Sequence, residues 1–219
     1  MTHKFELLVF DWDGTLMDSQ QEIVSCFQWA TRDLGMRVPA VDEIRNIIGL
    51  GMFQAIHTLF PELDSESKQK AVVDQYRYYY FSPEKPPATL FEGVVEMLNK
   101  LSAQGYLLSV ATGKGRRGLD QALARTGLNE IFHFTRCVDE AHSKPHPQML
   151  EDTMEYLGVD PQATLMIGDT EYDLLMAKNA GVQSVAVTCG AHEKARLLQH
   201  TPLVCMDQTS ELEIWLNNP

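Results

Sequence analysis

The sequence predicts an α/β fold: a Rossmann-like, three-layer α/β/α core with a parallel sheet, plus a small all-helical domain inserted after the first strand. Short apolar runs alternate with amphipathic segments in the second half of the chain, which is typical of βαβ units. Residues 17–88 instead show helical periodicity and no obvious strand. A chain of 219 residues is long enough to bury a substantial core in this arrangement.

The N-terminal part begins with a strand and continues with helices. Residues 5–10 are apolar on both faces and end at a turn signal, which predicts a buried strand. Residues 19–34 carry apolar side chains at three- and four-residue steps, which predicts a helix that stops at Gly35. A proline-rich stretch at 82–88 has the composition of a linker. Three further helices are expected before it, at 41–48, 52–60 and 65–81.

The second half alternates helices with strands. Helices are expected at 94–103, 118–126, 147–157 and 174–180. Strands are expected at 106–111, 164–167, 184–187 and 203–206. We therefore expect residues 1–16 and 89–219 to form the Rossmann-like core and residues 17–88 to form the helical domain.

Composition and charge exclude several classes of function. The net charge of −12 argues against a general nucleic-acid binder and against docking on anionic lipid. No apolar stretch approaches the roughly 18 residues of a membrane span, and the N-terminal residues do not resemble a signal peptide. The cysteines are scattered and form no CxxC pair, so we expect reduced thiols and a cytoplasmic protein.

Polar side chains follow three of the predicted strands at the point where each strand ends. Asp11 and Asp13 follow the first strand, Thr112 follows the second, and Asp169 follows the third. In open α/β sheets, ligands bind beyond the carboxyl ends of the strands. The sequence therefore predicts that these side chains converge on one site.

Asp11 and Asp13 are the most informative pair. Two carboxylates this close repel each other unless a cation lies between them or one is protonated. Mg²⁺ would resolve the conflict because it prefers carboxylate, carbonyl and water oxygens. A calcium loop of the EF-hand type is disfavoured, since its glycine stands at position six and a helix precedes it. A purely structural acidic turn remains an alternative.

The other strand ends are less specific when taken singly. Thr112 and Gly113 would suit a phosphate, but an ordinary βα turn has the same composition. Lys144 lies in a stiff proline-flanked segment and could neutralise a phosphoryl group, or could be a solvated lysine. Asp169 and Asp173 could form a second acidic corner, or one of them could cap a helix.

Taken together, these motifs resemble the haloacid dehalogenase superfamily over nearly the whole chain. The string DWDGTLMDS at 11–19 is similar to the first motif of the family, which has two aspartates one residue apart before Gly-Thr. Ala111-Thr112-Gly113 resembles the second motif, Lys144 the third, and Gly168-Asp169 with Asp173 the fourth. The subgroup it most resembles is that of the phosphoglycolate phosphatases, and residues 17–88 resemble the helical cap of that subgroup.

The resemblance implies a Mg²⁺-dependent phosphatase that hydrolyses a small phosphorylated metabolite, phosphoglycolate-like or a sugar phosphate, through an aspartyl-phosphate. Asp11 would be the nucleophile, and Asp13 would be the general acid and then the general base. The remaining implied roles form two sets. The metal ligands would be Asp11, the Asp13 backbone carbonyl and Asp169, with Asp173 acting through water or orienting the others. The phosphoryl oxygens would be held by Thr112, the Gly113 N–H and Lys144.

Substrate choice in this family depends on the cap. Gly49, Leu50 and Gly51 would form the cap loop that faces the site, because two glycines permit close approach. Four further side chains could contribute polar contacts, although a surface or packing role fits each of them as well: Arg45, His57, Arg116 and Arg117.

The resemblance also bears on other activities of the same scaffold. A dehalogenase or phosphonatase would lack Asp13, so both are disfavoured. A sugar phosphomutase would have histidine where this chain has Ile23, which makes mutase activity less favoured but leaves it open. Inorganic pyrophosphatase activity also stays open. A non-catalytic relative is disfavoured because the motif residues are intact. Two departures from the family pattern are Gly113, where asparagine is frequent, and Trp12, whose bulk we attribute to core packing.

Overall fold

A six-stranded parallel sheet runs through the α/β core of the computed structural model, which describes residues 4–217. Its order is β5-β4-β1-β6-β7-β8, so the chain moves outward from β1 through β4 to β5 and then returns to the other side of β1. This reversal places a topological switch point at the carboxyl ends of β1 and β6. The strands are β1 (Leu7–Phe10), β4 (Leu107–Thr112), β5 (Phe134–Cys137), β6 (Thr164–Gly168), β7 (Gln183–Val187) and β8 (Cys205–Met206).

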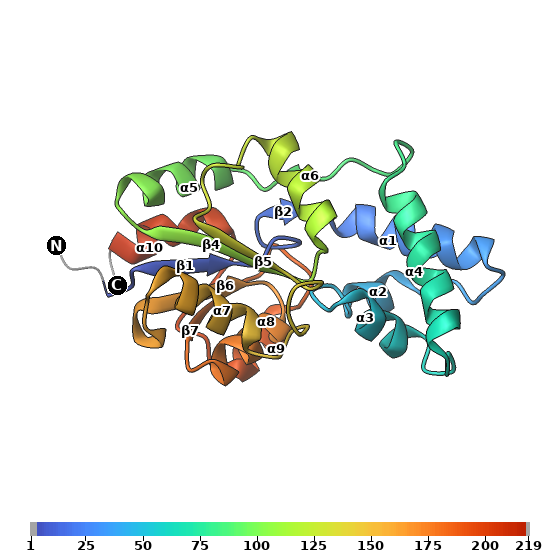
Figure 1. Cartoon of the computed structure of the whole chain (residues 1–219). Helices are drawn as coiled ribbons and strands as arrows, with labels where there is room; N and C mark the ends of the chain where they lie inside the picture. The colour runs from blue at the N-terminus through green and yellow to red at the C-terminus, as the bar shows by residue number, and fades with distance from the viewer. Residues whose placement is uncertain (1–3, 218–219) are drawn as a thin grey trace.

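Helices cover both faces of the sheet, because successive residues of a buried strand point to opposite sides. Leu8 and Phe10 of β1 pack into one apolar cluster with α5 and α6, whereas Leu7 and Val9 pack into another with α7 and α8. Figure 1 shows α5, α6 and α10 on one side of the sheet and α7, α8 and α9 on the other. These helices are α5 (Val94–Ala103), α6 (Arg116–Thr126), α7 (Gln148–Leu157), α8 (Glu171–Asn179), α9 (Lys194–Leu197) and α10 (Leu212–Asn217).

The remaining helices form a helical lobe, defined here as α1 to α4, which lies beside the end of the core opposite the described termini (Figure 1). The lobe has its own apolar cluster, in which Phe27, Ile44 and Ile56 are almost fully buried. A short antiparallel pair, β2 with β3, lies where the chain leaves the core and returns to it. The elements are α1 (Gln20–Asp33), α2 (Val41–Arg45), α3 (Met52–Leu59), α4 (Glu66–Tyr80), β2 (Met17–Asp18) and β3 (Thr89–Leu90).

The predicted fold class is confirmed: the core is a Rossmann-like α/β/α sandwich. Several details of the expectation were wrong. Residues 17–88 do contain a strand, β2, which is too short to leave a sequence pattern. The edge strand β5 was missed, because its residues FTRC mix polar with apolar side chains and three of the four are only half-buried. The helix expected at 41–48 ends at Arg45, and the strand expected at 203–206 is confined to Cys205–Met206.

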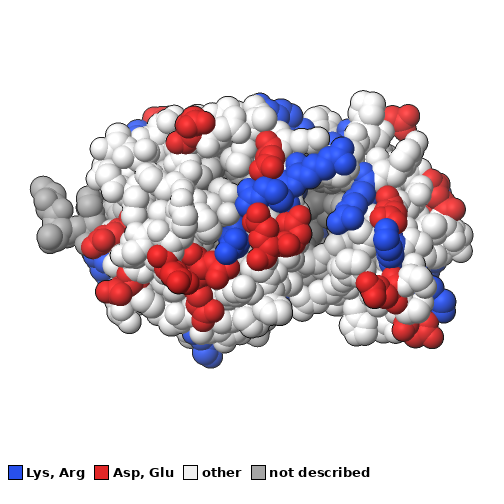
Figure 2. Space-filling view, in the orientation of Figure 1, with Lys and Arg blue, Asp and Glu red and all other residues white. Residues whose placement is uncertain are grey.

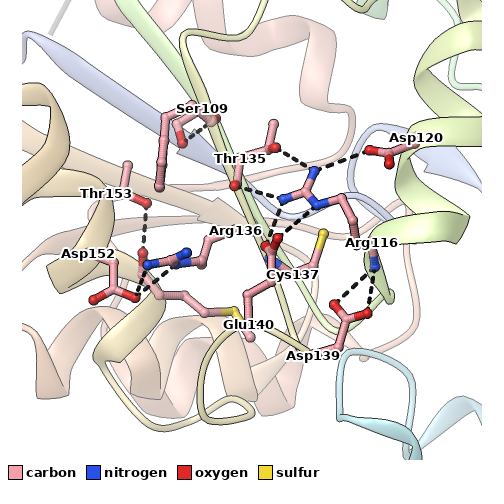
Figure 3. A network of polar contacts seen from close by, with 12 residues as sticks. Ser109, Arg116, Asp120, Thr135, Arg136, Cys137, Asp139, Glu140, Asp152 and Thr153 are labelled. Atoms are coloured by element: carbon pink, nitrogen blue, oxygen red, sulfur yellow. Dashed lines mark hydrogen bonds and ion pairs between the residues drawn. The ribbon is translucent and has the colours of Figure 1, made fainter.

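A polar network fixes the loop between β4 and α6 (Figure 3). The Arg116 backbone N–H donates to the Asp139 carboxylate at 3.0 Å, so Asp139 holds the first residue of α6. The Arg116 guanidinium donates to both oxygens of Glu140, at 3.0 and 2.7 Å, and to Thr135 on β5. Glu140 also accepts the Cys137 N–H at 3.0 Å. The network therefore ties the loop after β4 to the loop after β5.

Hydrogen bonds from Arg116 hold the pKa of Glu140 below its usual value of 4.5, even though partial burial opposes the shift. A carboxyl with a lowered native pKa stabilises the fold at pH above 4.5, and this contribution disappears as the pH falls through the native pKa. We therefore expect Glu140→Gln to lower the free energy of unfolding by about 1 kcal/mol at pH 7. The difference from wild type should shrink below pH 4.5.

Urea unfolding of both proteins from pH 7 to pH 3 measures this difference. Glu130→Gln is the matched control, because Glu130 is exposed and has no ion pair within residues 4–217. A deficit in Glu140→Gln that stays constant across the pH range would contradict the ion-pair argument.

Candidate active site

The first two aspartates of the sequence lie at the carboxyl end of β1, beside the switch point of the sheet. Asp11 is 1 % exposed, and its backbone N–H donates to Ile167 of β6 at 2.9 Å. Asp13 is held at both carboxylate oxygens: Ser19 Oγ donates to Oδ1 at 2.7 Å, and Lys114 Nζ lies 2.8 Å from Oδ2. The turn after β1 therefore presents two carboxylates in different surroundings.

Lys144 joins the ends of two strands. Its ammonium is fully buried and lies 2.7 Å from Asp11 Oδ1 and 2.6 Å from Asp173 Oδ1. The other oxygen of Asp173 accepts the Thr170 N–H and hydroxyl, so Asp173 also caps the start of α8. Asp11 Oδ2, in contrast, is buried and has no polar partner among residues 4–217.

Asp169 follows β6. Together with Asp11 and Asp173 it forms a cluster of buried carboxylates, called here the acidic corner. Thr15 Oγ1 donates to its Oδ1 at 2.8 Å, and the Ala191 N–H donates to its Oδ2 at 2.7 Å. Gly14 makes room for this carboxylate: its φ is +86°, and a Cβ there would lie 2.2 Å from Asp169 Oδ2. Any other residue at position 14 would be both strained and blocked.

Negative charge exceeds positive charge in this corner. Burial, together with the neighbouring Asp173 and Asp13, raises the pKa of Asp11 to about 7 against the opposing attraction of Lys144. Burial, Asp11 and Asp173 likewise raise the pKa of Asp169 well above its usual value. One lysine is therefore not enough to balance three buried carboxylates.

The residues present fit a hard divalent cation. Oxygens of Asp11, Asp169 and Asp173 all lie within 4.8 Å of one another, and all three residues are buried. The Asp11 carboxylate has an oxygen without a partner among residues 4–217, so its charge is not fully satisfied by protein groups. Carboxylate oxygens are the donors that Mg²⁺ prefers. The corner could thus hold a metal ion. The Asp13 carboxylate is not part of this cluster.

A cavity of about 280 Å³ opens between the α/β core and the helical lobe. Asp11, Asp13, Thr112 and Gly113 line its core side, together with Lys114 and Arg117. In Figure 2, lysine and arginine side chains gather on the visible face around the region between core and lobe, beside a hollow. The lobe contributes these lining residues: Ile23, Phe27, Ile47, Ile48, Gly49, Leu50, Met52, Ala55, Tyr76, Arg77, Tyr80 and Phe81.

The predicted loop of the lobe contacts the core through main-chain atoms. Gly49 and Leu50 line the cavity, and the Gly51 N–H donates to Ser143 Oγ at 2.7 Å, next to Lys144. Gly113 lies directly against this loop, because a Cβ at position 113 would be 2.5 Å from the Gly49 carbonyl oxygen. Glycine instead of asparagine at 113 therefore removes a side chain where the loop is in contact.

The side chains whose roles were left open have different surroundings. Arg117 lines the cavity, and its guanidinium lies 4.1 Å from the centre of the Phe81 ring. Arg116 belongs to the network of Figure 3 instead. Arg45 donates to the Ala191 carbonyl at 3.4 Å, which makes it a bridge between lobe and core. His57 is exposed on α3 and does not line the cavity.

Sequence reasoning missed three contacts of this site. Thr15 and Ser19 belong to the string that follows β1, and they hold Asp169 and Asp13 respectively. Their positions in that string, close to Asp11 and Asp13, could have indicated that they contribute to the site. Lys114 was given no role, whereas its ammonium lies 4.9 Å over the Tyr80 ring and pairs with Asp13. Trp12 is fully buried in the core cluster, so its packing role is confirmed.

Known proteins of similar sequence include two that are described as a phosphatase and a pyrophosphatase. A protein described as "Probable phosphatase IndB", from Dickeya dadantii (strain 3937), is 40% identical over 209 residues, 94% of this chain and 91% of that protein. "Pyrophosphatase PpaX" from Bacillus cereus (strain AH820) is 29% identical over 95% of both chains.

Solved structures share the fold. A predicted phosphoglycolate phosphatase from Haemophilus somnus 129pt superposes with a TM-score of 0.85 at 26% identity and covers 97% of each chain. A predicted phosphatase from Clostridium acetobutylicum gives a TM-score of 0.88 at 22% identity, with 98% of this chain and 99% of that one covered. The family model for haloacid dehalogenase-like hydrolases matches residues 8–187, which contain every motif residue described above. The chain belongs to the haloacid dehalogenase-like hydrolase family.

Proposed function

We propose that this protein is a Mg²⁺-dependent phosphatase that hydrolyses a small phosphorylated metabolite through an aspartyl-phosphate on Asp11. The observation that carries the proposal is the state of the Asp11 carboxylate. Its Oδ1 is paired with Lys144 at 2.7 Å, its Oδ2 has no polar partner, and the residue lines the cavity. A buried carboxylate oxygen that faces a cavity is suited to attack on phosphorus.

The chemistry proceeds in two displacements. Asp11 Oδ2 attacks the phosphorus, the ester P–O bond breaks, and Asp13 gives a proton to the departing alcohol. Asp13 then takes a proton from a water molecule, whose oxygen attacks the same phosphorus and breaks the bond to Asp11. Inorganic phosphate leaves and both aspartates return to their initial states.

Positive charge and hydrogen-bond donors would hold the phosphoryl oxygens. Lys144, the Gly113 N–H and the Thr112 hydroxyl are the candidates, because they surround the carboxyl ends of β1 and β4. Mg²⁺ held by Asp11, Asp169 and the Asp13 carbonyl would supply Lewis-acid neutralisation of the phosphoryl charge. Asp173 would orient this cluster through its contacts with Lys144 and Thr170.

We further propose that residues 17–88 act as a cap that selects the substrate and that residues 1–16 and 89–219 perform the chemistry. The lobe supplies most of the cavity lining away from Asp11, which supports this division. The cysteines are all free, which supports a cytoplasmic location. No helix within residues 4–217 has the length and apolar character to span a membrane.

Pyrophosphate is a second candidate substrate. The Bacillus relatives named as pyrophosphatases favour it, and so do Arg77 and Arg117, two cavity-lining guanidiniums without a carboxylate partner among the described residues.

Replacing Asp11 tests the proposal. Asp11→Asn should lower kcat by about a thousandfold or more, because the amide oxygen is a poor nucleophile. Phosphate release is measured with a panel of phosphoglycolate, pyrophosphate, hexose phosphates, nucleotides and an aryl phosphate, with Mg²⁺ and with EDTA. In wild type, acid-quenched turnover should leave one phosphoryl group on the peptide that contains Asp11.

The control is Asp160→Asn, an exposed aspartate outside the motifs and the cavity lining, which should keep wild-type activity. Circular dichroism checks that both variants fold. Undiminished turnover in Asp11→Asn, or in wild type with EDTA, would contradict the proposed mechanism.

Gly113→Ala tests the contact between lobe and core. The added Cβ would lie 2.5 Å from the Gly49 carbonyl oxygen, so the loop of the lobe must move away. We expect kcat/KM to fall by about a hundredfold, because displacement by about 1 Å disrupts the reacting geometry. Gly115→Ala is the matched variant, since its Cβ would lie 3.3 Å from Asp139 and its φ is −75°. Equal losses in the two variants, measured by steady-state kinetics, would contradict the contact argument.

A further inference from the structure

We propose that the substrate of this site is a phosphate monoester whose alcohol part is apolar and about the size of one six-membered ring. The inference rests on the proposed phosphatase function and narrows the substrate class. It follows from the chemistry of the cavity wall that faces Asp11, from the state of the polar groups in that wall, and from the volume enclosed.

The wall contributed by the helical lobe is mostly apolar. Its lining side chains include Ile23, Phe27, Ile48, Leu50 and Met52, and several of them are nearly buried within the lobe. None of the lobe residues that line the cavity is Ser, Thr, Asn, Gln, His, Asp or Glu, and its hydroxyl groups are those of Tyr76 and Tyr80. Arg77 is the one charged residue among them, and it is exposed.

Two further polar side chains of the cavity, Lys114 and Asp139, are already engaged, whereas Arg77 and Arg117 have no carboxylate partner among the described residues. Lys114 pairs with Asp13 at 2.8 Å, and its ammonium lies 4.9 Å over the Tyr80 ring. Asp139 accepts the Arg116 N–H at 3.0 Å. Away from the reaction centre, these two side chains therefore offer little to an incoming hydroxyl group.

The apolar wall favours substrates with an apolar alcohol part over substrates with many hydroxyl groups. A sugar phosphate would have to give up hydrogen bonds to water without replacing them, which weakens its binding for each hydroxyl that is buried. An apolar alcohol would gain contact with the same wall. The second phosphate of pyrophosphate would be met by Arg77 and Arg117, and both are exposed, where ion pairs contribute little.

The cavity volume limits the size of the substrate. A cavity of about 280 Å³ lies just below the usual range of about 300–1,000 Å³ for drug-sized ligands. It accommodates a phosphoryl group and a single ring better than a nucleotide, which carries a base and a sugar.

Cyclohexylmethyl phosphate and glucose 6-phosphate test the proposal directly. Both are primary esters on a six-membered ring, and they differ chiefly in hydroxylation. Their leaving groups are both primary alcohols, so the difference in kcat/KM reports recognition of the ring. We expect wild type to prefer cyclohexylmethyl phosphate by about tenfold or more, and to prefer it to ethyl phosphate, phosphoglycolate and pyrophosphate.

Two isosteric variants assign the preference to the wall. Met52 and Met36 both pack against the apolar cluster of the lobe, but only Met52 lines the cavity. Met52→Gln should lower the kcat/KM ratio of cyclohexylmethyl phosphate to glucose 6-phosphate by about fivefold to tenfold. Met36→Gln should leave that ratio as in wild type.

The results distinguish a failure of this inference from a failure of the proposed phosphatase function. A preference for glucose 6-phosphate, phosphoglycolate or pyrophosphate would overturn this inference and leave the phosphatase function intact. An equal change of the ratio in both methionine variants would also overturn it. Failure to hydrolyse every ester, in folded protein with Mg²⁺, would overturn the proposed function itself.

Discussion

The arrangement of the site depends on one buried ammonium group. Lys144 is without exposed surface, and burial alone would lower its pKa, yet the paired carboxylates of Asp11 and Asp173 outweigh this effect and raise it. A buried ammonium is stable only when carboxylates or other acceptors are placed close enough to balance its charge. Removing one of these partners leaves an uncompensated buried charge. Lys144 thereby joins the end of β1, the loop before α7 and the first turn of α8. These segments are distant in sequence and form one acidic corner because of it.

The sequence was sufficient to predict the sheet where strands are buried on both faces. The central strands β1, β4 and β6 are continuous apolar runs that end in polar turns, so their pattern has few alternative explanations. The edge strand β5 and the pair β2 with β3 were not predicted, because short, half-exposed strands are specified by their neighbours and not by their own composition. The boundaries of α2 and β8 depended on tertiary contacts in the same way.

For the site, the sequence predicted which residues converge but not how each is held. Asp11 and Asp169 were placed together from their strand-end positions, and Asp173 from the helix start that follows Asp169. The structure brings oxygens of all three within 4.8 Å of one another. The partners of these residues could not be predicted, since Thr15 reaches Asp169 across 154 positions of sequence. The apolar wall of the cavity also escaped prediction. Its side chains lie on α1, α3, α4 and the loop after α2, and their periodicity indicates only that they are buried.

The contact between lobe and core has a consequence for how such a protein can diverge. The loop of the lobe meets the core through the Gly49 carbonyl and the Gly51 N–H, which are main-chain groups. Main-chain docking places few demands on the identity of the surrounding side chains. The chain passes from the core into the lobe and back at the β2–β3 pair. The cavity-facing side chains of the lobe can therefore change without altering these main-chain contacts or the acidic corner.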